Sequence, residues 1–173
     1  MPTWDAETAE CLIFTYKEGL LSRAAHDLKI GVTRFDLSVD KGEVTASFDA
    51  RSLRTITAMK RGRENPSALS RTDRETIDER IRHAVLHSDR YPRIVFSGRG
   101  VPEPAQAWTT TGRLTLHGKD RPLTATIRTE GELWIARLQI DQNAFGITPF
   151  KAMMGTLRIK PRVDVIVRCT LSP

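Results

Sequence analysis

Three side chains in this sequence are of types that could do acid–base chemistry. His26 and Asp27 are adjacent, and His117 stands between two runs of alternating apolar and polar residues. A histidine beside a carboxylate can act as a general base or hold a metal ion. Neither the ligand spacing of a metal site nor a serine-nucleophile motif accompanies these residues. We therefore predict no catalytic residue, no metal site and no cofactor. An enzyme that acts on a lipid-like substrate through His26, Asp27 or His117 is kept as an alternative.

The two cysteines, Cys11 and Cys169, fall in the first and last strand-like runs of the chain. In the first run Leu12, Phe14 and Tyr16 share a face, which puts Cys11 on the opposite face. In the last run Cys169 continues the apolar face. We therefore expect the two sulfurs to point to opposite sides of a sheet and to be free thiols, as in a reducing compartment.

The net charge of +6 is concentrated in one part of the chain. Between Arg51 and Arg93 there are 11 Lys/Arg and 6 Asp/Glu residues. Such a patch could bind a nucleic acid or another acidic surface, but no aromatic side chain that could stack on a base occurs before Tyr91. A solvated basic face is the favoured interpretation, and a nucleic-acid or acidic-surface binder is kept as a less favoured alternative.

The size and composition of the chain, 173 residues with 39% hydrophobic and 28% charged, indicate one globular domain over residues 1–173. No apolar run approaches the length of about 18 residues that a membrane span needs. The first ten residues have no basic start and no apolar core, unlike a secretory signal. A location in the cytoplasm is therefore predicted.

Strict alternation predicts most of the strands. Residues 110–128 alternate on both sides of a Gly-Lys-Asp loop, which predicts an antiparallel hairpin, with Pro122 at the start of its strand or at a bulge. Val44, Ala46, Phe48 and Ala50 should face a core. The apolar residues change parity between 28–32 and 35–39, which predicts a bulge or corner near residues 33–34.

Residues 52–70 lose this alternation and are expected to run over the surface. Thr72 and Glu75 match a capping box, and apolar residues then follow at helical spacing, so an amphipathic helix is predicted over about 72–86. Its single apolar stripe should lie against the sheet.

About eight strands and one helix give an all-β fold class with antiparallel neighbours. Such strands close as a sandwich or as an up-and-down barrel, and periodicity alone does not decide between them.

Three motifs in order resemble the YceI-like family: Ser88–Ser97 (SDRYPRIVFS), Gly112–Leu123 (GRLTLHGKDRPL) and Phe145–Ile147 (FGI). Residues 25–27 and 50–55 add weaker matches. The resemblance implies an eight-stranded antiparallel barrel, lipocalin-like in shape, with a helix packed at its side. It also implies an elongated apolar lumen that binds a long isoprenoid or other lipid chain. Many relatives carry a secretion signal and an arginine shortly before Phe-Gly-Ile, whereas this chain has Asp141, Gln142 and Asn143 there.

From the resemblance we predict a carrier or scavenger of a polyisoprenoid, isoprenoid quinone or other long-chain lipid, and leave a homodimer open. The candidate lumen residues are Phe14, Tyr16, Phe48, Phe96, Leu114, Leu116 and Trp134. An apolar loop is the candidate gate for the ligand, or else a plug that packs on the barrel end: Phe145, Ile147, Phe150, Met153 and Met154. The candidate contacts for a lipid head group are Lys119, Arg121 and Lys151, which could equally be ordinary turn charges.

Overall fold

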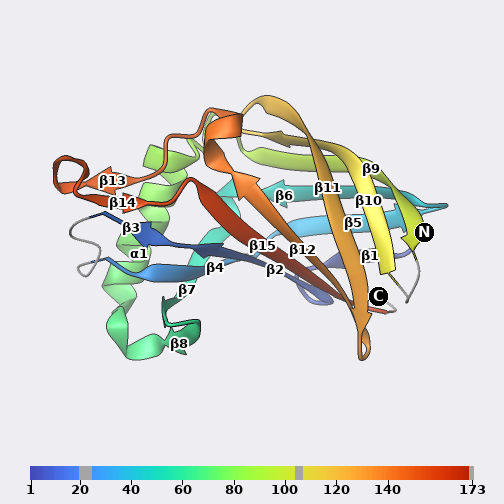
Figure 1. The fold of residues 1–173 in the computed structure, drawn as a ribbon, viewed down its shortest axis with the longest axis horizontal. Coiled ribbons are helices and arrows are strands. Elements are labelled where there is room, and N and C mark those ends of the chain that lie inside the picture. Colours follow the sequence, from blue (N-terminus) through green and yellow to red (C-terminus); the bar gives the residue numbers. More distant parts are fainter. Residues whose placement is uncertain (20–24, 104–106, 172–173) are drawn as a thin grey trace.

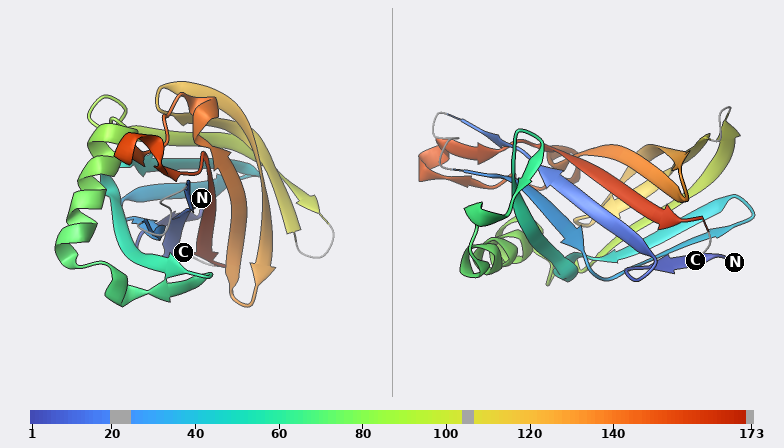
Figure 2. Two further views of the ribbon diagram at one scale, coloured as in Figure 1. Left: turned by 60° about the vertical axis from the view of Figure 1, so that its left-hand side comes forward. Right: turned by 90° about the horizontal axis from the view of Figure 1, so that it is seen from below.

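A computed structural model of the chain describes residues 1–19, 25–103 and 107–171. One large antiparallel sheet dominates it and is rolled strongly about its long axis (Figures 1 and 2). The first strand, β1 (Thr3–Asp5), and the end of β15 (Arg162–Thr170) lie together at one end of the roll, and the helix lies at the other end. None of the described helices is both long and apolar enough to cross a bilayer.

The large sheet has twelve strands, and its two edge strands, β1 and β8, do not pair with each other. The antiparallel, mostly-β prediction is confirmed, but the count of eight strands in a closed barrel is wrong. The strands in spatial order are β1 (Thr3–Asp5), β5 (Phe35–Asp40), β6 (Glu43–Asp49), β9 (Arg93–Glu103), β10 (Ala107–Leu116), β11 (Lys119–Glu130), β12 (Leu133–Asp141), β15 (Arg162–Thr170), β2 (Ala9–Thr15), β4 (Asp27–Val32), β7 (Leu53–Lys60) and β8 (Arg63–Asn65).

A second, three-stranded sheet projects from the helical end of the molecule (Figure 1). It consists of β13 (Lys151–Ala152), β14 (Leu157–Ile159) and β3 (Lys17–Glu18). All of its pairings are antiparallel. Short helical turns complete the chain: η2 (Ala50–Ser52), η3 (Pro66–Ala68), η5 (Gln142–Phe145) and η6 (Met153–Gly155).

The predicted hairpin is present as β10 and β11, which pair from Leu116 with Lys119 to Ala107 with Arg128. The turn is shorter than expected, because only His117 and Gly118 lie between the strands, with φ of 53° and 71°. Two residues with positive φ match the right-handed twist of a hairpin. Pro122 lies inside β11, opposite Arg113, and not at its start.

The pairing of β11 with β12 is incomplete. It covers only Thr126–Glu130 of β11, so residues 119–125 have β10 as their one sheet neighbour. Pro122 is tolerated there because it has no backbone N–H, and the unpaired edge of β11 needs no N–H for a ladder hydrogen bond. The two strands diverge toward the helical end (Figure 1). We call this divergence the β11–β12 seam.

The change of parity near residues 33–34 has a topological cause. β4 pairs with β2 and β7, whereas β5 pairs with β1 and β6, so the chain crosses between two parts of the sheet. Ser52 holds this corner: its carbonyl accepts from Thr33 N–H and Oγ1–H, and its Oγ accepts from Arg34 N–H. Apolar side chains on both strands can therefore face the same interior.

The expected surface run over residues 52–70 is wrong for its first half, which forms β7. Leu53, Thr55, Thr57 and Ala58 are buried in this strand. Two of the four are threonines, which hid the alternation of hydropathy although threonine is a favourable strand residue.

The predicted helix is present as α1 (Arg71–Arg80), which continues through one π-helical turn, η4 (Ile81–Val85). The capping box differs from the prediction: Ser70 and Asp73 form it, two residues before Thr72 and Glu75. The helix is fastened to β7 by the buried Asp78, whose Oδ1 accepts the Thr55 N–H at 2.7 Å.

Candidate functional site

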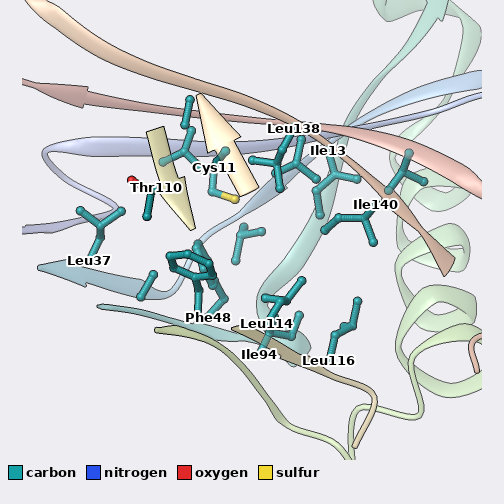
Figure 3. Close-up of a pocket in the computed structure, with 18 of the residues that line it drawn as sticks. Cys11, Ile13, Leu37, Phe48, Ile94, Thr110, Leu114, Leu116, Leu138 and Ile140 are labelled. Atoms are coloured by element: carbon teal, nitrogen blue, oxygen red, sulfur yellow. The ribbon is translucent and has the colours of Figure 1, made fainter. Parts of the chain in front are cut away.

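The rolled sheet encloses an apolar cavity of about 320 Å³ (Figure 3). Ten strands of the large sheet contribute to its wall, and Ile81, Val85 and Leu86 close the helical end. Among the residues that the structure describes, no charged side chain lines the cavity. The polar side chains in the wall are Thr15, Thr110 and Gln142. A cavity of this size and polarity is of the kind that holds small apolar ligands.

The inner wall is incompletely covered by other side chains. Several apolar residues point inward and yet are only half-buried, because their inner surfaces meet empty space and not neighbours: Ile13, Leu37, Phe48, Ile94, Leu138 and Ile140. Packed protein cores leave few voids larger than a water molecule. The interior is therefore a lumen and not a filled core.

Most of the candidate lumen residues lie in this wall. Phe48, Phe96, Leu114, Leu116 and Trp134 line the cavity, and so does Ile147 from the candidate loop. The expected alternation over residues 44–50 is confirmed, because Val44, Ala46 and Ala50 are buried and Thr45 is exposed.

Phe14 and Tyr16 do not lie in the wall, which corrects that part of the prediction. β2 presents Cys11, Ile13 and Thr15 to the cavity, so Phe14 and Tyr16 are on its outer face. The Tyr16 hydroxyl donates a hydrogen bond to Asp164 on the neighbouring β15. Burial, and then this bond, raise the pKa of Tyr16 to about 12. Both faces of β2 carry apolar residues, so alternation of hydropathy alone does not identify the face that lines the cavity.

The cysteines point to the same side of the sheet, contrary to the prediction. Cys11 pairs with Val167 and Cys169 pairs with Ala9, so the two are diagonal neighbours, and both line the cavity. Both are free, as predicted. Diagonal positions on paired strands are about 7–8 Å apart, beyond the usual reach of a disulfide. Burial raises the pKa of Cys11 to about 12 and that of Cys169 to about 11.

These two thiols predict a loss of stability at high pH. Because their folded pKa values lie above the ordinary value of 9.0, the unfolded chain loses these protons first. The contribution of the two thiols to the free energy of unfolding is fully present below pH 9 and is lost as the pH rises toward 11 and 12. We expect the urea-unfolding free energy to fall more steeply above pH 9 in the wild type than in Cys11→Ala/Cys169→Ala. Equal slopes would contradict this assignment.

The candidate loop divides into two parts. Phe145 and Ile147 are buried at the helical end of the cavity and pack with Leu116. Phe150 lies beneath the Arg80 guanidinium, 5.5 Å from its ring centre. Met153 and Met154 are exposed and do not line the cavity. The first part is therefore packed against the body of the sheet, and the second lies away from the cavity wall.

Two of the three candidate head-group residues lie beside the β11–β12 seam. Arg121 Nε donates to the carbonyl of Ala144 at 3.0 Å, and the Lys119 side chain lies against Gly146. Both residues belong to the part of β11 that β12 does not cover. Lys151 is in the separate three-stranded sheet, where it pairs with Arg158.

The candidate acid–base residues do not come together. Asp27 Oδ1 accepts the Lys17 N–H at 2.8 Å, at the start of β4. His117 is in the β10–β11 turn, where its ring lies 4.5 Å from that of Tyr91 and 5.6 Å from that of His87. Burial, first of several causes, lowers the pKa of His117. Across the described ranges no group of three or more His, Cys, Asp or Glu side chains is placed to hold a metal ion.

The basic residues between 51 and 93 spread over several elements, from η2 through β7, β8, α1 and η4 to the start of β9. Some have acidic partners: Arg51 Nε lies 3.0 Å from Asp49, and Arg71 Nε lies 2.8 Å from Glu75. Partly neutralised charges on a helix and a strand edge are typical of a solvated surface. Binding of a nucleic acid there stays an alternative prediction.

Solved structures with a similar fold include three bacterial proteins. BcnA of Burkholderia cenocepacia is 13% identical, with a TM-score of 0.66 over 95% of this chain and 96% of that one. A polyisoprenoid-binding domain from Saccharophagus degradans, implicated in plant cell wall breakdown, is 10% identical, with a TM-score of 0.56 over 98% and 97%. A Campylobacter jejuni YceI protein is 10% identical, with a TM-score of 0.63 over 86% of each chain.

No curated protein matched the sequence. The family model of the YceI-like domain, however, matches residues 6–171, which is nearly the whole chain. This match agrees with the three motifs, with the rolled antiparallel sheet and with the enclosed apolar cavity. The chain therefore belongs to the YceI-like family.

Proposed function

We propose that this protein binds one long apolar chain, an isoprenoid, an isoprenoid quinone or another lipid, in the cavity of the rolled sheet. The observation that carries the proposal is the wall itself, whose described part has no charged side chain and leaves its apolar inner surfaces uncovered. Each methylene transferred from water into such a wall contributes roughly 0.8 kcal/mol. The polyisoprenoid-binding domain with the same fold supports this class of ligand.

The β11–β12 seam is the proposed place of the head group and of ligand access. The ladder between β11 and β12 covers only Thr126–Glu130, so beyond it the two strands can separate without breaking inter-strand hydrogen bonds. Lys119 and Arg121 beside the seam could hold a phosphate or a quinone oxygen. Phe145 and Ile147 would then cover the apolar chain below that head group.

The role as a carrier or scavenger fits a binding site without a catalytic constellation. Neither His117 nor the His26–Asp27 pair faces the cavity among its described lining residues, which favours binding over lipid chemistry. The cytoplasmic location and a homodimer stay predictions that accompany this role.

The proposal is tested by organic extraction and native mass spectrometry of the purified full chain. We expect a long-chain lipid in the extract and a mass shift of the folded protein that disappears on denaturation. A prenyl alcohol is then titrated into the delipidated protein. The fluorescence intensity of Trp134 and Trp108, which both line the cavity, should change as the alcohol binds. Protein that neither carries an extractable chain nor responds to added prenyl alcohol would refute the proposal.

A further inference from the structure

The tip of the β13–β14 hairpin exposes two methionines to solvent. Met153 is 61% exposed and Met154 is 98% exposed. The tip lies at the far end of the molecule, beyond the helix, in Figure 1 and in the right view of Figure 2. Exposed apolar residues that are grouped in this way usually mark a contact with another apolar phase.

The backbone holds the methionines in this position. Met153, Met154 and Gly155 have φ of 51°, 57° and 85°, and a non-glycine residue rarely adopts such a conformation. The carbonyl of Met153 accepts both the Thr156 hydroxyl at 2.6 Å and the Thr156 N–H at 3.2 Å. Strained residues of this kind persist where the surrounding structure fixes them, and they gather at sites of function.

The base of the tip is anchored to the body of the protein. Ile159 N–H donates to the carbonyl of Phe150 at 3.0 Å, and the Phe150 ring lies beneath Arg80 of α1. The pairing of Lys151 with Arg158 and of Ala152 with Leu157 completes the hairpin. The methionines are therefore presented on an ordered support.

The hairpin and the residues that follow it are rich in positive charge. Residues 149–162 contain no acidic residue, and their four basic residues are all exposed: Lys151, Arg158, Lys160 and Arg162. An ion pair within this group joins Arg158 to Glu18 at 4.0 Å, where both side chains meet solvent. Glu18 offsets one of these charges, and the region stays net positive.

From this geometry we propose that the β13–β14 tip docks the protein on the surface of an anionic bilayer. Met153 and Met154 enter the boundary between head groups and acyl chains, and Lys151 and Arg158, which pair in the same hairpin, meet the anionic head groups. Apolar insertion combined with a basic collar is the usual chemistry of reversible membrane-surface binding. Methionine suits the inner contact because its flexible side chain adapts to a fluid phase.

The positive charge of the hairpin region favours an anionic bilayer as the partner and disfavours a second copy of this chain. Two copies meeting tip to tip would bring the basic residues of both hairpins together, and Glu18 is the one acidic residue in the described strands of each three-stranded sheet. An anionic surface neutralises that charge. Docking does not require that the cavity be occupied, so this inference stands independently of the proposed ligand.

The test is cosedimentation of the full chain with phosphatidylcholine vesicles, with and without phosphatidylglycerol. We expect binding to the anionic vesicles that weakens as NaCl is added. Met153→Gln/Met154→Gln should weaken it at least tenfold without changing the net charge. Lys151→Gln should weaken it about fivefold, from the roughly 1 kcal/mol that each basic residue contributes at an anionic surface.

The control is Val101→Gln/Leu171→Gln, which removes two exposed apolar side chains at the opposite end of the molecule. It should bind vesicles as the wild type does, and circular dichroism should report the same fold for all variants. Prenyl alcohol uptake from solution should survive in the methionine variant, which separates docking from cavity binding. Vesicle binding that is absent in the wild type, or that is equally strong in the methionine variant, would overturn the inference. Conversion of a dimer to a monomer by that variant, without vesicle binding, would assign the tip to a protein contact and also overturn it.

Discussion

Ala125→Phe is expected to weaken the binding of a long prenyl chain by about tenfold or more. Ala125 lies in β11 and lines the cavity, so a phenyl ring there occupies space that the ligand would fill. Each methylene excluded from the wall costs roughly 0.8 kcal/mol, and two of them suffice for this effect. The matched control is Thr124→Phe, one residue earlier on the exposed outer face of the same strand. It should leave the affinity unchanged in a titration followed by tryptophan fluorescence.

The same variant tests whether the interior is open. In an unfilled lumen the added ring finds room, so the unfolding free energy of Ala125→Phe should equal or exceed that of the wild type. In a core already filled by side chains, the ring would force other residues to move and cost about 1–3 kcal/mol. A loss of that size in urea denaturation, together with unchanged prenyl binding, would contradict both the lumen and its proposed ligand.

Trp4→Ala is expected to lower the unfolding free energy by about 3–5 kcal/mol, in the usual range for removing a buried tryptophan. Trp4 is 1% exposed, although it is only four residues from the start of the chain. Its ring centre lies 5.6 Å from that of Trp134, and its Nε1–H donates to the carbonyl of Thr170 at 2.9 Å. It thereby connects the edge strand β1 to β12 and β15, across the interior of the roll.

Trp4→Phe separates the two contributions of this side chain. It keeps much of the apolar contact with Trp134 but cannot donate to Thr170, so a smaller loss of about 1 kcal/mol is expected. Urea denaturation followed by circular dichroism measures both variants. If Trp4→Ala lowered the unfolding free energy by less than Trp4→Phe does, β1 would not support the fold.

Strands with one polar face were predictable from the sequence, and strands with two apolar faces were not. Val44 to Phe48 and the β10–β11 hairpin alternate cleanly, and their inward residues were identified correctly. On β2 the outer face also carries large apolar residues, so the choice between Leu12 and Ile13 as the inner residue could not be made from alternation. This choice also reversed the predicted direction of Cys11.

The remaining errors have local causes. In β7 the inward positions include Thr55 and Thr57, whose polarity resembles that of a surface run. At the start of α1 two overlapping capping patterns occur, and the one that begins at Ser70 forms the box. The strand count failed because short edge strands such as β1 and β8 have three residues each, too few to show a period. The seam depends on where β11 and β12 diverge, which no pattern within either strand records.

β1 and the end of β15 meet at the end of the molecule opposite the β13–β14 tip, which has a practical consequence for orientation. A tag or surface tether attached at either terminus would hold the molecule with the tip directed away from the attachment point. Immobilised protein would thus keep both the tip and the wider mouth of the seam free for vesicles in a flow experiment. The same proximity would let a short peptide join the two termini, so that new ends could be opened in the Lys41–Gly42 turn without displacing either region.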